Sequence, residues 1–217
     1  TDALRALHPG ERIYTFWDYV RNAWGRNAGL RLDHLLLSPD LARPDGSYDA
    51  EPMHGWIGSP LEPKGDPLLA GVGPGAWAQR ADHPDMTFEG EVKIVPLRVA
   101  SDHGVARQDT DPRGLPVYGA DDEVAGTVKD MWVDRSEMLF RYIEVALKDG
   151  SSVLLPVNFS RIRKDGVHVH ALLAGQFGRV PRTASPEQVT LLEEEKIMAC
   201  YGAGLLYATA DRQEPLW

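Results

Sequence analysis

The chain has 217 residues, 43% of them hydrophobic and 25% charged, which is ordinary for one large globular domain or a domain with appendages. The net charge is −9, and the acidic excess lies after residue 43, where 27 Asp and Glu face 17 Lys and Arg. An acidic body binds polyanions poorly, so nucleic-acid binding is not expected. The single cysteine, Cys200, excludes an internal disulfide and a cysteine-cluster metal site, and indicates a reducing compartment.

Membrane-spanning and secretory patterns are missing from this sequence. No stretch approaches the roughly 18 to 20 consecutive apolar residues of a membrane helix, and no charged start precedes an apolar signal region. Taken alone, the chain is therefore expected to be soluble and cytoplasmic.

Residues 1–43 are predicted to form a first unit, made of a helix, a strand, a polar loop and a second strand. Leu4 and Leu7 have helical spacing, while residues 13–17 (IYTFW) and 32–37 (LDHLLL) have the composition of strands.

Within this unit, YTFWDY at 14–19 and GLRLD at 29–33 resemble the late part of an exonuclease III-type apurinic-site endonuclease. The resemblance implies that Trp17 borders an abasic-sugar pocket and that Asp33 lies near a catalytic metal. The metal-binding Glu, the Tyr and the Asp-x-Asn of that family come earlier than this fragment, and no equivalent precedes Thr1. Without a metal cage and a base to activate water, we expect the fragment to be inactive.

Residues 44–84 form the second predicted unit, an irregular extended segment. Gly, Pro, Asp and isolated apolar residues dominate it, with no sustained period of 2 or 3.6. Such a segment is ordered only where other elements support it.

Residues 85–217 form the third predicted unit, in which short strands alternate with turn residues. Pro96 favours an edge position or a bulge for the first strand, and Asp149-Gly150 and Asp165-Gly166 suit tight hairpins. The predicted strands span residues 92–99, 116–118, 124–133, 140–147, 152–157, 159–163 and 167–171.

One strand shows a clear alternation, in which Ile143, Val145 and Leu147 are separated by Tyr142, Glu144 and Ala146. This pattern predicts a half-buried strand. Together, the strands indicate a small, closed or nearly closed antiparallel barrel.

A helix follows the strands. Thr190 and Glu193 have the spacing of a capping box, and the helix is predicted to run to about Tyr201 and end in residues 202–204 (GAG). The fold class is therefore α+β, mostly β, with a carboxyl-terminal helix.

Three stretches carry a second resemblance: RGLPVYG at 113–119, VAGTVKDMWVDRSE at 124–137 and VTLLEEEK at 189–196. Together they resemble the cytoplasmic domain of the H subunit of the purple-bacterial photosynthetic reaction centre, a PRC-barrel protein. The likeness extends over residues 59–217, and its first part resembles the H-subunit segment that crosses the membrane-embedded partner subunits.

The resemblance implies a non-catalytic subunit that caps and stabilises the cytoplasmic face of the reaction centre and helps conduct protons to the secondary quinone. The implied partners are the L and M subunits, through which the chain would associate with the photosynthetic inner membrane. Bacteriochlorophyll, bacteriopheophytin, quinone and non-haem iron would be held by those partners, and no cofactor by this chain. The alternatives are the endonuclease fragment and a soluble PRC-barrel adaptor for RNA maturation factors.

The resemblance also assigns site residues. Glu137 matches the glutamate near the secondary quinone, Asp134 and Arg141 match its neighbours, and Glu194 matches an acid beside the proton pathway. A carboxylate buried against other carboxylates has a raised pKa and can both accept and release protons near neutrality. We expect Arg141 to neutralise Asp134 or Glu137 as a structural partner.

Two further acids, Glu89 and Glu91, are candidates for collecting protons at the surface. Some H subunits have an aspartate and two histidines in this region, where this sequence has Thr87, Glu89 and Glu91. Because the histidines are replaced, a divalent-metal site is not expected here. His168 and His170 share a strand face at i,i+2 spacing, but two ligands without a third indicate a polar face. No metal site is therefore predicted.

Overall fold

The computed structural model describes residues 50–55, 59 and 61–212. The unit predicted for residues 1–43, with Trp17 and Asp33, lies outside them. The strands are β1 (Ala50–Pro52), β2 (Leu61–Pro63), β3 (Ile94–Pro96), β4 (Pro116–Tyr118), β5 (Val124–Asp134), β6 (Leu139–Leu147), β7 (Ser152–Pro156), β8 (Ser160–Ile162) and β9 (Val167–Val169). Short 3-10 helices are η3 (Gly73–Gly75), η4 (Val157–Phe159), η5 (Ala174–Arg179) and η6 (Ala210–Arg212), and the α-helix is α2 (Leu191–Tyr207).

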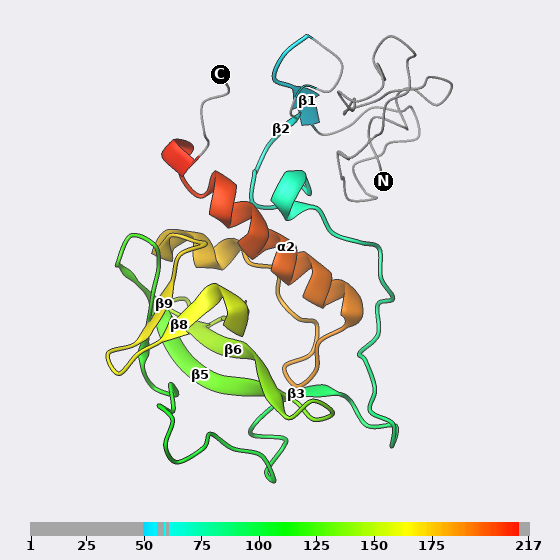
Figure 1. Cartoon of the computed structure of the whole chain (residues 1–217), viewed down its shortest axis with the longest axis vertical. Helices are drawn as coiled ribbons and strands as arrows, with labels where there is room; N and C mark the ends of the chain where they lie inside the picture. Colours follow the sequence, from blue (N-terminus) through cyan, green and yellow to red (C-terminus); the bar gives the residue numbers. More distant parts are fainter. Residues whose placement is uncertain (1–49, 56–58, 60, 213–217) are drawn as a thin grey trace, which may run out of the picture.

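Seven strands form one strongly bent sheet, and α2 lies across it (Figure 1). The strand order is β7-β6-β5-β4-β9-β8, and β3 pairs with β5 outside this path, while β1 and β2 form a separate hairpin. The predicted fold class, α+β and mostly β, is confirmed. The sheet is not closed, because β7 and β8 are its two ends.

One pair of strands departs from the predicted antiparallel arrangement. β4 and β9 run parallel, with Val117 opposite Val167. A parallel pair requires a long connection, and here the chain passes through β5 to β8 before it returns beside β4. Pro96 was predicted to favour an edge position or a bulge, and the edge position is the one found, since among the described strands β3 pairs with β5 alone.

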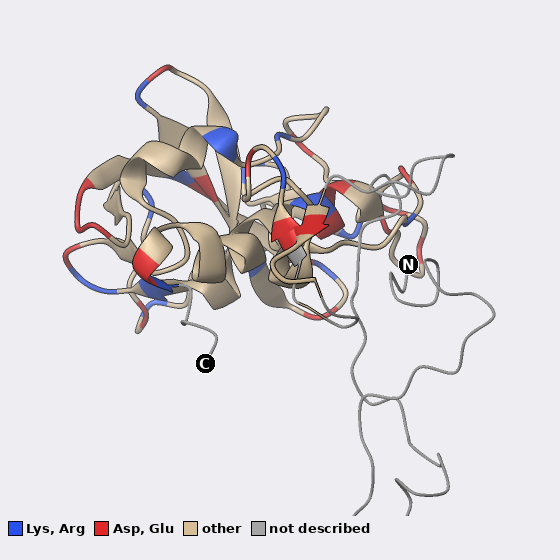
Figure 2. Cartoon of the chain, turned by 90° about the horizontal axis from the view of Figure 1, so that it is seen from above, with Lys and Arg blue, Asp and Glu red and all other residues tan. Residues whose placement is uncertain are grey.

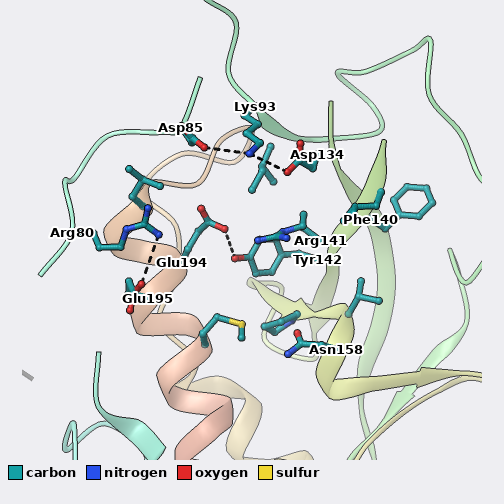
Figure 3. A pocket seen from close by; sticks show the side chains of 16 residues that line it. Arg80, Asp85, Lys93, Asp134, Phe140, Arg141, Tyr142, Asn158, Glu194 and Glu195 are labelled. Atoms are coloured by element: carbon teal, nitrogen blue, oxygen red, sulfur yellow. Dashed lines mark hydrogen bonds and ion pairs between the residues drawn. The ribbon is translucent and has the colours of Figure 1, made fainter. Parts of the chain in front are cut away.

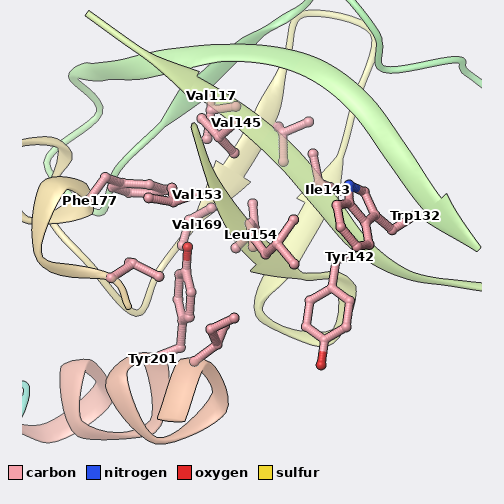
Figure 4. Close-up of a cluster of buried hydrophobic side chains, with 14 of the residues drawn as sticks. Val117, Trp132, Tyr142, Ile143, Val145, Val153, Leu154, Val169, Phe177 and Tyr201 are labelled. Carbon is pink, nitrogen blue, oxygen red and sulfur yellow. The ribbon is translucent and has the colours of Figure 1, made fainter. Parts of the chain in front are cut away.

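Strand β6 is buried on both faces over its central part. Ile143 and Val145 are fully buried in the core, as the alternation predicted (Figure 4). Tyr142 and Glu144 are buried as well, so the prediction of an exposed opposite face was wrong. The reason is that this second face is covered: Tyr142 meets a side chain of α2, and Glu144 binds cations and Trp132.

Helix α2 starts as predicted. Thr190 Oγ1 accepts a hydrogen bond from the Glu193 amide at 3.1 Å, and Glu193 Oε2 accepts one from the Thr190 amide at 2.8 Å. This reciprocal pair satisfies two amide groups at the helix start.

The predicted end of this helix was wrong, because α2 continues through Gly202 and Gly204 to Tyr207. A Cβ atom at Gly202 would collide with the Pro74 carbonyl oxygen, and one at Gly204 with the Ala171 carbonyl oxygen. These glycines therefore allow close backbone packing within a continuous helix.

The predicted irregular segment is ordered where α2 supports it. The amides of Leu191 and Leu192 donate to the carbonyl oxygens of His83 and Ala81, at 3.1 and 3.2 Å. We call residues 77–86 the strap, because this segment crosses the first turn of α2. The strap thereby supplies acceptors for amides that a helix start leaves without partners.

Candidate functional site

A cavity of about 830 Å³ opens between β3, the ends of β5 and β6, and the first turns of α2 (Figure 3). Its walls bring together charged residues that are far apart in the sequence. Its lining residues are Arg80, Asp85, Lys93, Ile94, Asp134, Leu139, Phe140, Arg141, Tyr142, Pro156, Val157, Asn158, Leu191, Glu194, Glu195 and Met198.

Lys93, placed just before β3, is the central cation of the cavity. Its Nζ lies 3.5 Å from Asp85 Oδ2, 3.6 Å from Asp134 Oδ2 and 3.8 Å from Glu137 Oε1. Burial disfavours its charged form, but the carboxylates of Asp134, Asp85 and Glu137 outweigh this and raise the pKa of Lys93. The ammonium therefore stays charged and holds three acids in one cluster.

Asp134 ends β5 and is buried, with 1% of its surface exposed. Its Oδ1 accepts hydrogen bonds from the backbone amides of Ser136 and Glu137, both at 3.0 Å. The carboxylate thus fixes the turn that leads into β6. Glu137 is carried by this turn, and about half of its side chain is exposed.

Glu194, in the first turn of α2, faces the same cavity. Tyr142 donates a hydrogen bond to its Oε2 at 2.6 Å. Burial raises the pKa of the Glu194 carboxyl, although the hydrogen bond from Tyr142 and the nearby Arg141 and Arg80 partly oppose this. Burial and the neighbouring Glu194 carboxylate also raise the pKa of Tyr142, so its hydroxyl remains a donor.

Arg141 acts on a different acid from the ones predicted. The sequence assigned Arg141 to Asp134 or Glu137, but the cation within ion-pair distance of both is Lys93. Arg141 lines the cavity opposite Glu194, and its charge lowers the pKa of that carboxyl.

The two acids predicted at the surface lie on the loop before β3. Glu91 Oε2 pairs with Arg135 Nη1 at 2.8 Å, and Arg135 Nε also donates to the Val92 carbonyl oxygen at 3.0 Å. Glu89 is exposed at the tip of the loop. Of the five acids predicted, Asp134 and Glu194 line the cavity, Glu137 joins it through Lys93, and Glu89 and Glu91 lie outside it.

A second charged cluster escaped the sequence analysis. We call it the buried network: Glu144 accepts from Arg98 Nη1 at 2.6 Å, from Lys129 Nζ at 2.8 Å and from Trp132 Nε1 at 3.1 Å. Arg98 also binds Asp130 Oδ2 at 3.2 Å. Burial opposes ionisation of Glu144, but the bonds from Lys129, Arg98 and Trp132 prevail and lower its pKa. The sequence signal that could have revealed this network is the presence of four charged residues in predicted strands: Arg98, Lys129, Asp130 and Glu144.

Basic and acidic residues are interspersed along the described part of the chain (Figure 2). Within the described residues, no group of three His, Cys, Asp or Glu side chains converges as a metal site would require. His168 instead stacks on Tyr118, with ring centroids 5.0 Å apart, and His170 is exposed. The helices of this same part of the chain are all too short or too polar to cross a membrane.

Comparison with known families gives two matches in succession. Residues 30–99 match the family described as the photosynthetic reaction centre H-chain N-terminal region, and residues 105–174 match the PRC-barrel domain. Of these, the second range contains β4 to β9, including the turn that carries Asp134 and Glu137.

Comparison with curated proteins gives a short match of another kind. The chain is 48% identical over 42 residues to the DNA repair nuclease APEX1 of Danio rerio. The match covers 19% of this chain and only 14% of the length of that relative.

Proposed function

We propose a role in proton delivery for this chain, which belongs to the family of photosynthetic reaction-centre H subunits. Members of this family are non-catalytic parts of a complex with other subunits. For this chain we propose the L and M subunits as partners, the cytoplasmic face of the photosynthetic membrane as the location, and the secondary quinone as the proton acceptor. The pigments, quinone and non-haem iron would then be bound by the partners.

The observation that carries the proposal is a cavity that brings a carboxyl with a raised pKa close to carboxylates paired with a lysine. Glu194 has a raised pKa and a hydrogen-bond donor, Tyr142, at 2.6 Å. Asp134 lines the same cavity, and Glu137 joins it through Lys93, since both carboxylates lie within 4 Å of the Lys93 ammonium. A carboxyl with a raised pKa can hold a proton at a pH at which an ordinary surface glutamate has lost it.

The three carboxylates around Lys93 serve a second purpose. They concentrate negative charge around Lys93, which favours protons nearby, while the ammonium limits their mutual repulsion. Glu137 is half exposed and can exchange protons with water, whereas Glu194 is more buried. We propose that protons pass from Glu137 through water in the cavity towards Glu194 and the partner subunits.

The decisive experiment replaces Glu137 with Gln in the assembled complex. We expect the proton-coupled second electron transfer to the quinone to slow severalfold, measured after the second of two light flashes, because the amide cannot carry a proton. Glu123→Gln is the matched control, since Glu123 is an exposed acid at the opposite end of β5. An unchanged rate in the Glu137 variant would exclude the proton role and leave the structural role intact.

A second candidate activity rests on the match to APEX1. It predicts nicking of a duplex with one abasic site in the presence of Mg²⁺. We expect no nicking above the buffer control, since the match covers only 14% of that nuclease. The third candidate, an adaptor for RNA maturation factors, predicts co-purification with ribosomal components instead of bacteriochlorophyll.

A further inference from the structure

Phe88 lies at the tip of a tight turn that leads into β3, and its relative exposure of 101% means that its own chain covers none of it. The turn is held by backbone bonds, because the Thr87 amide donates to the Glu91 carbonyl oxygen at 2.8 Å and the Gly90 amide to the Thr87 carbonyl oxygen at 3.0 Å. The segment that leads into β3 runs along the outer edge of the molecule (Figure 1). An aromatic ring presented on an ordered turn is typical of an interface anchor.

The residue that follows adds a negative charge to this tip. Glu89 is exposed, and among the described residues no cation lies within ion-pair distance of its carboxylate. Glu91, at the base of the same turn, is instead paired with Arg135 at 2.8 Å. We call Phe88 and Glu89 the knob, since together they present a phenyl ring beside a carboxylate without a cationic partner in the described chain.

A second cavity, of about 230 Å³, lies between α2 and the segment around η3. We call it the α2 pocket. Its lining is apolar apart from one ammonium and one thiol, and it includes Leu69, Trp77, Pro181, Lys196, Ala199 and Cys200. A cavity of about 150 Å³ is sufficient to hold benzene, so the α2 pocket has room for a phenyl ring.

The ammonium of the α2 pocket is the electrostatic complement of the knob. Lys196 Nζ lies over the ring of Trp77, 4.8 Å from its centroid. Within the part of the chain that the structure describes, no carboxylate is within ion-pair distance of this ammonium. An apolar cavity with a cation at its side therefore matches an aromatic side chain with an acid at its side.

We propose that the chain associates with itself head to tail, with Phe88 of one copy in the α2 pocket of the next and Glu89 paired with Lys196. The knob and the α2 pocket are different surfaces, so a dimer leaves one of each free and further copies can add. One aromatic anchor and one ion pair make a small interface, and we expect weak association that increases with protein concentration.

The first test is sedimentation velocity of the full chain at rising concentration, in which the mean mass should increase beyond that of a dimer. Phe88→Ala should weaken association at least about tenfold, because it removes the anchor. Its fold should be unchanged, since Phe88 is fully exposed. Met138→Ala is the control and should associate like the parent chain. Met138 is 71% exposed in the turn between β5 and β6, where its φ angle is +56° and its sulfur contacts His103.

A mixing experiment identifies the two surfaces. Phe88→Ala lacks the knob but keeps the pocket, whereas Leu69→Asp keeps the knob and places a carboxylate in the pocket. Leu69 is 49% exposed, so this variant should fold. Neither variant should associate alone, and an equimolar mixture should form a complex that stops at the dimer, because only one knob and one intact pocket meet.

A charge exchange tests the ion pair. Glu89→Lys and Lys196→Glu should each weaken association, and the double variant should restore it, because the pair is then formed with its charges reversed. Three results would each overturn the proposal: a chain that stays monomeric at every concentration, Phe88→Ala association equal to the parent, or a mixture of the two single-surface variants that forms no complex.

Discussion

The cavity and the buried network contain similar residues but treat their acids in opposite ways. In the cavity, Glu194 receives its closest hydrogen bond from a neutral hydroxyl, and its pKa is raised. In the buried network, Glu144 receives two bonds from cations and one from an indole, and its pKa is lowered. Glu144 is therefore held as a charged group between strands, whereas the carboxyl of Glu194 takes up a proton more readily than an ordinary glutamate.

The difference teaches that burial alone does not identify a proton carrier. Both carboxyls lose water, and that loss is the largest influence on the pKa of each. The outcome depends on how many cationic donors compensate for it.

The strongest test of this contrast is Glu144→Gln. The amide leaves Arg98 and Lys129 without their negative partner, so we expect the free energy of unfolding to fall by about 3 kcal/mol. This value is at the low end of the usual loss of stability when one partner of a buried ion pair is removed, because both cations retain contact with solvent. Urea denaturation measures it, with Glu137→Gln, a half-exposed acid, expected to cost less than about 1 kcal/mol. Equal losses in the two variants would contradict the contrast.

The second test compares pH dependence. The folded pKa of Glu194 is raised, so its stabilising contribution is present at low pH and is lost as the pH rises through that value. The folded pKa of Glu144 is lowered, so its contribution is present at neutral pH and is lost as the pH falls.

Over about pH 3 to 7, Glu194→Gln should therefore become more stable relative to the parent chain as the pH rises above about 4. Glu144→Gln should become less stable relative to it as the pH rises to about 4.5, with little further change above that value. Urea midpoints across this range give both slopes. Slopes of the same sign would show that the two acids do not differ as proposed.

The smallest expected effect concerns the turn that carries the acids of the cavity. Met138→Gly removes the cost of a left-handed methionine, and we expect a gain of about 0.5 to 1 kcal/mol in the free energy of unfolding. Thermal unfolding measures it, with Met86→Gly as the control that should show no gain. A loss of stability at Met138 would mean that the thioether contact with His103 outweighs the backbone cost.

Local signals predicted the elements of the fold well. Residues 116–118 form β4 with the predicted bounds, and the capping box at Thr190 starts α2. Both depend on interactions within a few residues. The end of α2 was missed because Gly202 and Gly204 resemble a helix stop locally, while their function is to accommodate Pro74 and Ala171.

The site was predictable only in part, for the same reason. Family resemblance indicated Asp134, Glu137 and Glu194, and the structure brings the first and last to one cavity. The residues that set their electrostatics are Lys93, just before β3, and Tyr142, on β6, and their side-chain contacts depend on the tertiary packing. From the alternation along β6, Glu144 was wrongly predicted to be exposed to solvent. The sequence pattern does not show which other residues cover the second face of this strand.

The strap, residues 77–86, has a mechanical consequence for the cavity. It holds α2 by backbone bonds from Leu191 and Leu192, and Ala78 and Arg80 of the strap also contact the Glu195 carboxylate. Tension on the chain ahead of the strap would thus be transmitted to the helix turn that contains Glu194. A shift of that upstream segment would in this way change the depth of Glu194 in the cavity, and with it the burial that raises the pKa of this carboxyl.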